Sequence, residues 1–167
     1  MAIESLSAVP PGSDVFIDAN IFIYGLNGQS PQCYDFFQRC AREDVFGITS
    51  FEVLSEVLHQ LMLAEAVTKG LIAQHDWRFL GRNPKVVRQL YDYWNQVEQI
   101  LDLNFLILGL GERIFRRSQT VRRSYGLLTN DSLHVAAMEE YGLDLLATND
   151  NGFGSIPTLT IYKPTDA

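Results

Sequence analysis

The segment Val15-Phe16-Ile17-Asp18-Ala19-Asn20 constrains the fold of this chain more than any other. Its first three residues are β-branched or aromatic, which is typical of a strand buried on both faces of a parallel sheet. Asp18 and Asn20 follow at the carboxyl end of that strand. Open α/β folds bind their ligands outside the carboxyl ends of their strands, so a carboxylate and an amide at this point predict a polar ligand site.

The remainder of the chain alternates short apolar runs with helical patterns, as in a parallel sheet that helices cover on both faces. Further strands are predicted at residues 46–48, 105–108, 145–147 and 159–162. The last of these strands is expected at an edge of the sheet. Helices are predicted at residues 20–26, 31–42, 49–68, 71–80, 84–101 and 109–125. A last helix, capped by Thr129 or Asn130, is predicted to run to about residue 141. We therefore expect an α/β fold, a three-layer α/β/α sandwich with a central, mostly parallel four- to five-stranded sheet.

Local signals mark the helix ends. Thr49 with Glu52 three residues later matches a capping box, in which each residue satisfies a backbone N–H of the first turn. Gly126 and Gly142 stand where helices commonly stop.

The chain divides into a prefix and one domain. Residues 1–13 are expected to be a flexible N-terminal prefix, because Pro10-Pro11-Gly12 closes them. Residues 14–167 have the size of a single domain. A helical insertion at about residues 71–101 interrupts the alternation of strands and helices.

Composition limits the class of protein. Apolar residues make up 47% of the 167 residues and charged residues 20%, which is the balance of a globular domain. No apolar run approaches the roughly 18 residues that span a bilayer, and residues 1–13 contain no basic residue, so we expect a cytoplasmic protein without membrane contact. Cys33 and Cys40 lack partners at zinc-ligand spacing and are expected to be reduced thiols.

The formal net charge of −7 argues mildly against a nucleic-acid partner, because such proteins usually carry a basic surface. Net charge, however, describes solubility and the long-range field better than it describes one groove. Clustered acids could also belong to a mechanism in which bound metal neutralises them.

Acidic residues recur at corresponding places in the predicted fold. Asp18 and Asp150 each follow a strand, and Asp131 lies in the first turn of a helix. Glu52 or Glu56 lies on the helix after the second strand. Strand carboxyl ends and helix amino ends share one rim of a parallel α/β sheet, so these acids can converge.

Each acid alone has a structural explanation. Asp18 could cap the next turn, Asp131 could serve the helix dipole, and Asp150 could belong to an ordinary turn. Glu52 alone is better explained by the capping box than by a ligand role. Only the joint occurrence of these acids favours a site. Crowded carboxylates repel one another unless a cation offsets them, and Mg²⁺ prefers oxygen ligands, so the site is predicted to bind a divalent metal suited to phosphodiester hydrolysis.

Four segments in order carry a resemblance to a known family: Phe16–Asn20, Val53–Leu58, Asn130–Ala137 and Leu146–Asp150. This arrangement is similar to that of the PIN-domain ribonucleases, particularly the VapC-like toxins of bacterial and archaeal toxin–antitoxin pairs. The N-terminal prefix and the insertion at residues 71–101 depart from the small toxins.

The resemblance implies a catalytic and metal-binding set of four acids, Asp18, Glu56, Asp131 and Asp150. It thereby favours Glu56 over Glu52, and it implies Asn20 and Thr148 as supporting residues. The implied activity is that of an endoribonuclease that hydrolyses RNA with a water activated by Mg²⁺ or Mn²⁺. The implied partners are RNA, a second copy of the chain in a homodimer and, for a toxin, an antitoxin protein.

Two other functions are open at this stage. The chain could be a catalytically inert PIN-like binding module, which metal would neither stabilise nor activate. It could also be a phosphotransferase with Asp18 as nucleophile, although that class usually has a second Asp where Asn20 stands.

Basic residues suggest where RNA could bind. The helix from Gly111 carries five candidates, Arg113, Arg116, Arg117, Arg122 and Arg123, whose guanidinium groups could bind phosphates. A solvated helix face or a face for an acidic partner explains them nearly as well. A second basic stretch, Arg78, Arg82, Lys85 and Arg88, has Trp77 and Phe79 nearby, which could stack on RNA bases but are expected to pack in the core. His134 is expected to pack and to hydrogen-bond locally.

Overall fold

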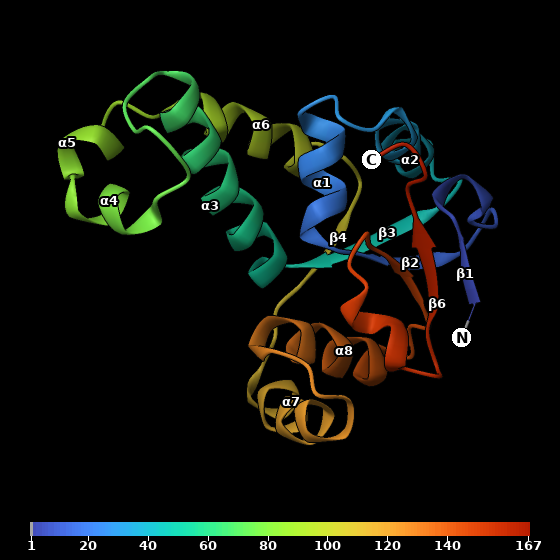
Figure 1. The fold of residues 1–167 in the computed structure, drawn as a ribbon. Coiled ribbons are helices and arrows are strands. Elements are labelled where there is room, and N and C mark those ends of the chain that lie inside the picture. The colour runs from blue at the N-terminus through green and yellow to red at the C-terminus, as the bar shows by residue number, and fades with distance from the viewer. Residues whose placement is uncertain (1) are drawn as a thin grey trace.

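A single parallel sheet forms the centre of the molecule in the computed structural model, which describes residues 2–167 (Figure 1). Its order is β1-β6-β5-β2-β3-β4, and every neighbouring pair is parallel. The strands are β1 (Ala2–Ser5), β2 (Asp14–Ile17), β3 (Phe46–Ser50), β4 (Leu106–Leu108), β5 (Leu145–Ala147) and β6 (Thr160–Lys163). The predicted α/β/α sandwich is confirmed, but the sheet has six strands and not four to five.

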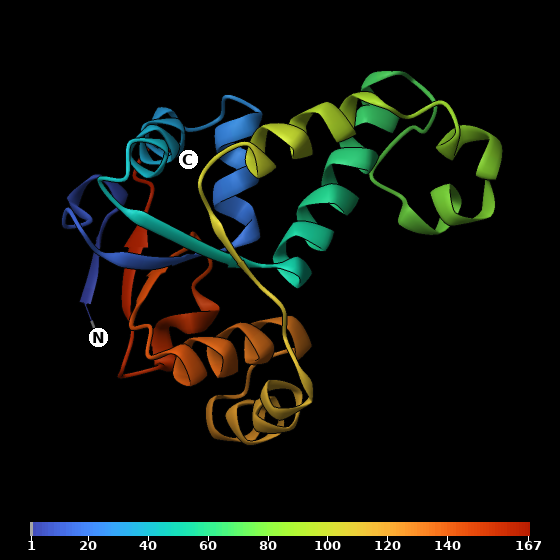
Figure 2. The same cartoon turned by 180° about the vertical axis from the view of Figure 1, so that it is seen from behind.

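Helices cover both faces of this sheet (Figures 1 and 2). The first group, α1, α2, α3 and α6, lies on one face, and α7 and α8 pack together on the other. The helices are α1 (Ala19–Leu26), α2 (Pro31–Ala41), α3 (Phe51–Thr68), α4 (Trp77–Arg82), α5 (Pro84–Val87), α6 (Asp92–Leu101), α7 (Glu112–Tyr125) and α8 (Thr129–Tyr141). Two short 3-10 helices, Leu6–Ala8 and Gly152–Ser155, complete the fold.

The N-terminal segment is part of the sheet, so the predicted flexible prefix at residues 1–13 is wrong for the residues described; Met1 lies outside them. Strand β1 pairs with β6, from Ala2 opposite Thr160 to Ser5 opposite Lys163. Leu6 is fully buried and Val9 nearly so. Strand β1 also makes the predicted edge position of the last strand wrong, because β6 lies between β1 and β5.

Strand β2 lies where the order in which strands are added to the sheet changes direction. From β2 the chain proceeds to β3 and β4 on one side, and it returns to add β5 on the other side of β2. Phe16 lies opposite Leu146 and Ile17 opposite Ala147, so β2 and β5 end in register. Such a reversal opens a crevice at the carboxyl ends of the two strands, which is where open α/β sheets bind ligands.

Helix ends follow the sequence signals in part. Gly126 and Gly142 end α7 and α8 in left-handed conformations with φ of 71° and 69°, as predicted. The capping box is wrong, because Ser50 caps α3 by accepting from the N–H of Val53, while Thr49 donates to the carbonyl of Ile17. At α8 the cap residue is Leu128, and neither Thr129 nor Asn130 takes that place.

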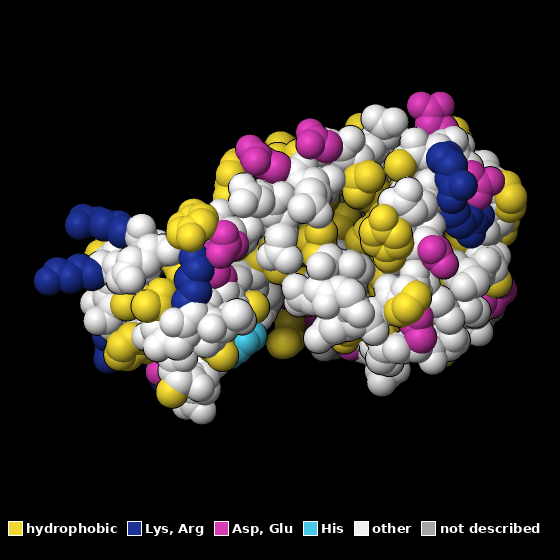
Figure 3. All heavy atoms as spheres, turned by 90° about the horizontal axis from the view of Figure 1, so that it is seen from above, with side chains coloured by type: hydrophobic (Ala, Val, Ile, Leu, Met, Phe, Trp, Pro, Cys, Tyr) yellow, Lys and Arg dark blue, Asp and Glu magenta, His cyan; other side chains and the backbone are white. Residues whose placement is uncertain are grey.

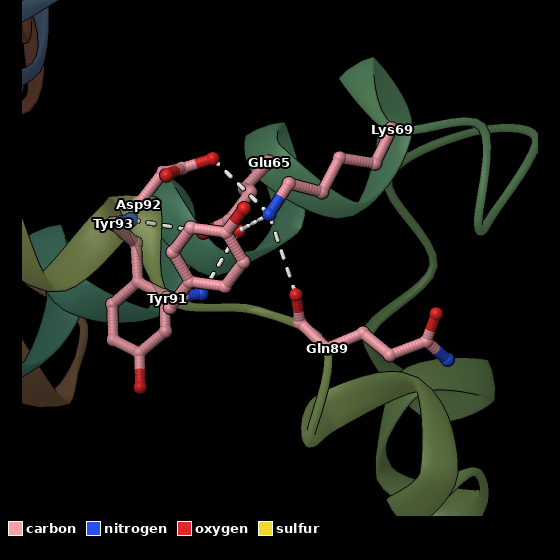
Figure 4. A network of polar contacts seen from close by, with 6 residues as sticks. All are labelled: Glu65, Lys69, Gln89, Tyr91, Asp92 and Tyr93. Carbon is pink, nitrogen blue, oxygen red and sulfur yellow. Dashed lines mark hydrogen bonds and ion pairs between the residues drawn. The ribbon is translucent and has the colours of Figure 1, made fainter.

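The insertion contains three helices in place of the predicted two. Residues 71–80 and 84–101 were each expected to form one helix, but Asp76 caps a later start for α4, and the chain unwinds between α5 and α6. Glu65 of α3 lies at that break and accepts hydrogen bonds from the N–H groups of Tyr91 and Tyr93 at 2.9 and 2.8 Å (Figure 4). A carboxylate from another helix thus caps α6.

Two hydrophobic clusters stabilise the molecule. The larger one lies between the sheet and its helices. The smaller one joins the second half of α3 to the insertion through Leu63, Ala66, Ile72, Leu80 and Leu90. None of the helices in residues 2–167 has the length and apolar character needed to cross a bilayer. Cys33 and Cys40 are free and buried, and burial raises the pKa of Cys33 to about 11 and that of Cys40 to about 12, which keeps both as thiols.

Candidate metal centre

Asp18 lies where strand β2 ends and helix α1 begins. Its backbone N–H still pairs with the carbonyl of Ala147 in β5 at 3.0 Å, and its Oδ1 accepts from the N–H of Ala19 at 2.7 Å. Asp18 therefore caps α1 as expected from its position. The side chain is only 8% exposed, so the carboxylate is buried where β2 and β5 end side by side.

Asn20 and Thr148 hold the second oxygen of Asp18. Oδ2 accepts from Nδ2 of Asn20 and from Oγ1 of Thr148, both at 2.6 Å. Oγ1 of Thr148 also accepts from the N–H of Asp150 at 3.0 Å, and Oδ1 of Asn20 accepts from the N–H of Asn149 at 2.9 Å. This network joins the ends of β2 and β5 and fixes the turn that carries Asp150.

Helices α3 and α8 bring two more carboxylates to the same rim. Glu56 projects from the second turn of α3, which starts at the end of β3 beside β2. Asp131 lies in the first turn of α8. Nδ2 of Asn130 donates to Oε2 of Glu56 at 3.4 Å and links the two helices.

The charges of these acids act on one another. Burial and then the charge of Asp18 raise the pKa of Glu56. Burial, followed by the charges of Asp150, Asp18 and Glu56, raises the pKa of Asp131. None of the ion pairs found within residues 2–167 involves any of these four acids. These acids therefore carry negative charge that no cation of the described residues offsets by an ion pair.

The donor set fits a hard divalent cation. Carboxylate, amide and hydroxyl oxygens are the ligands that Mg²⁺ and Mn²⁺ prefer. Within the described part of the chain, however, no three His, Cys, Asp or Glu side chains come close enough to enclose a metal ion. Mg²⁺ keeps several waters and takes only one or two carboxylates directly, so an open set of acids suits it better than a closed cage.

Comparison with known proteins identifies the family. The PIN domain family model matches residues 15–159, which is most of the chain. The chain belongs to the PIN domain family. Two curated relatives from Methanocaldococcus jannaschii bear the name ribonuclease: VapC6 is 25% identical over 160 residues, covering 90% of this chain and 97% of its own, and VapC2 is 26% identical over 150 residues, covering 89% and 93%.

Solved structures show the same fold. VapBC2 from Rickettsia felis, bound to a DNA fragment from its promoter, superposes with a TM-score of 0.62 at 17% identity and covers 90% of this chain and 98% of its own. A toxin–antitoxin complex from Klebsiella pneumoniae gives a TM-score of 0.59 at 19% identity, covering 92% and 99%. At this identity the two structures establish the PIN fold alone.

Glu52 and His134 are two further titratable residues near Asp18 in this PIN domain, since the charges of Asp18 and Glu52 both act on His134. Glu52 makes no capping-box contact, and its Oε2 is buried without a partner among the described residues. His134 packs against Phe16 with ring centroids 5.6 Å apart. The expected local hydrogen bond is absent within residues 2–167, since both ring nitrogens are buried and unpartnered. Burial lowers the pKa of His134, although the charges of Asp18 and Glu52 oppose this.

The arginines of α7 are largely engaged within the chain. Arg113, Arg116 and Arg117 pair with Glu140, Glu112 and Glu139 at 2.7, 2.6 and 2.8 Å. Arg122 donates to Gln119 and Ser132. Arg123 is exposed. The sequence alone suggested a row of unpaired cations on α7, but most of these arginines pair with residues of the chain.

Lys163 is a polar neighbour of the site that the sequence did not indicate. Its Nζ donates to Oδ1 of Asn151 at 2.6 Å and to the carbonyl of Asn149 at 3.4 Å, and so it braces the turn on both sides of Asp150. Asn130 is another, since its sequence position suggested a helix cap and not a contact with Glu56. The strand register from β5 to β6 would be needed to anticipate the role of Lys163.

Proposed function

We propose that this chain is an endoribonuclease that hydrolyses RNA phosphodiester bonds with the help of Mg²⁺ or Mn²⁺. What supports the proposal most is the position of Asp131, whose pKa is raised by burial and by the charges of Asp150, Asp18 and Glu56. None of these four acids has an ion-pair partner within residues 2–167. Membership of the PIN family and the curated relatives named ribonuclease support the proposal.

In this proposal each residue of the site has a defined task. Asp18, Glu56, Asp131 and Asp150 would hold the cation. Asn20 and Thr148 position Asp18, because both donate to its Oδ2 and thereby keep it oriented. A bound divalent cation supplies charge neutralisation for the phosphate and activation of the attacking water.

The partners follow from the same relationship. We include an antitoxin partner and a homodimer in the proposal, because the relatives are VapC ribonucleases and one structural neighbour is a toxin–antitoxin complex. The enzyme would then act on RNA in the cytoplasm. Size-exclusion chromatography with light scattering measures the dimer directly.

RNA cleavage by wild type and Asp18→Asn, with Mn²⁺ and with EDTA, tests the proposal. Asn retains the capping ability of Asp at α1 but removes the charge, so we expect a folded protein whose cleavage rate falls at least about a hundredfold. EDTA should abolish wild-type cleavage. Asp144→Asn, an exposed acid outside the site, is the matched control and should cleave like wild type.

Each alternative function gives a different result. Cleavage at the wild-type rate by Asp18→Asn would refute the assignment. An inert binding module would cleave nothing under any condition. A phosphotransferase that uses Asp18 as nucleophile would yield a covalent phosphate on that residue.

A further inference from the structure

The insertion differs in charge from the rest of the molecule. We call residues 71–91, which include α4 and α5, the helical lobe. The lobe contains one acid, Asp76, against the four basic residues Arg78, Arg82, Lys85 and Arg88. Its formal charge is therefore +3, and since the chain carries −7, all other positions together carry −10. The lobe is a basic patch on an acidic protein.

The basic side chains of the helical lobe are free to bind a ligand. All four are exposed, and none of them takes part in an ion pair within residues 2–167. The arginines of α7, by contrast, mostly pair with Glu residues of α7 and α8. Figure 3 shows Lys and Arg side chains that project from the far end of the lobe, at the left of the view. These cations are therefore better placed for phosphates than those of α7.

Exposed aromatic side chains accompany these charges. Trp77 is 58% exposed and Phe79 45%, so the expectation that they pack in the core is wrong. The guanidinium of Arg78 lies 5.4 Å from the centroid of the Trp77 ring. Exposed rings beside unpaired cations form the combination that binds single-stranded nucleic acid, in which bases stack on rings and phosphates meet cations.

The helical lobe is held at a fixed position relative to the acidic site. Helix α3 begins beside the site and carries Glu56 in its second turn, and the lobe packs on the other end of the same helix (Figure 1). The rise from Glu56 to Thr68 is about 18 Å at 1.5 Å per residue. Glu65 and Lys69 fasten this end of α3 to the start of α6 (Figure 4). A nucleic-acid strand that leaves the site can thus follow α3 to the lobe.

We propose that the helical lobe is an arm that binds single-stranded RNA and holds the substrate strand beside the nuclease site. The arm rests on the proposed function in that it takes the bound RNA to be the substrate. Its +3 charge attracts a polyanion locally, although the net negative charge of the rest of the protein repels it. Trp77 and Phe79 supply the stacking surface, which accepts any base.

The test compares two double variants that lose the same types of group. Trp77→Ala with Arg82→Gln removes one exposed ring and one exposed cation from the helical lobe. Tyr34→Ala with Arg42→Gln removes the same from α2 and its end, outside the lobe. All four side chains are exposed, so both variants should unfold like wild type. Binding of a labelled uridine-rich RNA of about 12 nucleotides is measured by fluorescence anisotropy in EDTA over a range of salt concentrations.

The arm predicts a loss in the lobe variant only. Its affinity should fall about tenfold, and the slope of log K against log salt should lessen by about 0.7 for the lost phosphate contact. In cleavage assays with Mn²⁺, its KM should rise for the 12-nucleotide RNA while kcat stays near the wild-type value. The α2 variant should match wild type in both assays.

The outcomes separate the arm from the nuclease. If wild type and the lobe variant bind RNA with equal affinity, the helical lobe is not an RNA-binding arm. This holds even if the variant binds an acidic peptide less well. The proposed nuclease function is unaffected by that result as long as wild type cleaves RNA. If the lobe variant binds RNA more weakly but wild type never cleaves the RNA that it binds, the RNA-binding arm is supported and the proposed nuclease activity is refuted.

Discussion

At the scale of single residues, Asp131 opposes folding in the absence of metal. Its place in the first turn of α8 should stabilise the carboxylate by about 0.3–1 kcal/mol. Burial and the charges of Asp150, Asp18 and Glu56 nevertheless raise the pKa of Asp131, so the cost of ionising it exceeds the gain from the helix. A charged side chain whose neutralisation would increase the stability of the fold is a candidate for a functional role.

Asp131→Asn should therefore stabilise the metal-free protein at neutral pH, within the roughly 0.5–2 kcal/mol of common stabilising substitutions, while it abolishes RNA cleavage. An acid whose pKa is raised on folding favours the folded state when protonated, and its contribution is lost as the pH rises above 3.8 through the folded value. The gain from Asn should accordingly be larger at pH 7 than at pH 4. Urea unfolding in EDTA at both pH values measures it.

Asp35→Asn, an exposed acid on α2, is the control for Asp131 and should change the free energy of unfolding by less than about 0.5 kcal/mol. A clear loss of stability in Asp131→Asn at pH 7 would contradict the repulsion inferred for the site.

At the scale of elements, Glu65 joins α3 to α6 and so fixes the helical lobe. Burial by itself raises the pKa of Glu65, but Lys69 and the N–H groups of Tyr91, Tyr93 and Asp92 outweigh it and lower the pKa from 4.5 to about 2. Nζ of Lys69 lies 3.1 Å from Oδ2 of Asp92 and 3.6 Å from the centroid of the Tyr91 ring. One buried carboxylate thus satisfies the first turn of α6 and a cation of α3.

Glu65→Gln should destabilise the protein by about 2–3 kcal/mol at pH 7, because the amide keeps one acceptor but loses the charge. For an acid whose pKa is lowered on folding, the stability is present above pH 4.5 and disappears as the pH falls toward 2. Wild type and variant should therefore converge in stability near pH 2–3. Urea unfolding across this range is the measurement. Glu98→Gln, an exposed acid on α6, should follow the wild-type curve, and parallel curves for wild type and Glu65→Gln would disprove the role of the charge.

Elements with a strong local signal were predictable from the sequence, and those defined by distant contacts were not. Strand β2 is buried on both faces and reads as an apolar run, which also located Asp18. Strand β1 contains Glu4 and an exposed Ile3, and only its pairing with β6 makes it a strand. The break before α6 is where Glu65 accepts its hydrogen bonds, and Glu65 lies 26 residues from Tyr91 along the chain.

The same distinction applies to the candidate site. Its acids follow strand ends or lie in the first turns of helices, so topology alone predicts that they share one rim of the sheet. The contacts of Lys163 and Asn130 could not be predicted, because they depend on strand register and on the direction of the side chains. The exposure of Trp77 was mispredicted because helical spacing suggests a buried face, whereas the small cluster of the helical lobe is filled by Leu80, Leu90 and their neighbours.

At the scale of the whole molecule, charge is divided between the acidic site and the basic lobe, and a bound cation changes that balance. Relief of repulsion among the four acids stabilises only the folded state, since they are far apart in the unfolded chain. A cation at about one hundred times its Kd stabilises the fold by about 2.7 kcal/mol, which corresponds to about 5–10 °C in Tm for a chain of this size. Thermal unfolding with and without Mn²⁺ should show this shift for wild type.

Asp150→Asn should lose most of the Mn²⁺ shift, because it removes one of the acids that raise the pKa of Asp131. Asp144→Asn should keep it, and an equal ionic strength of NaCl should not reproduce it in wild type. Since unfolding is measured without RNA, the result is independent of activity. A shift of the same size in Asp150→Asn would mean that Mn²⁺ binds elsewhere, and the acids would then need another explanation for their convergence.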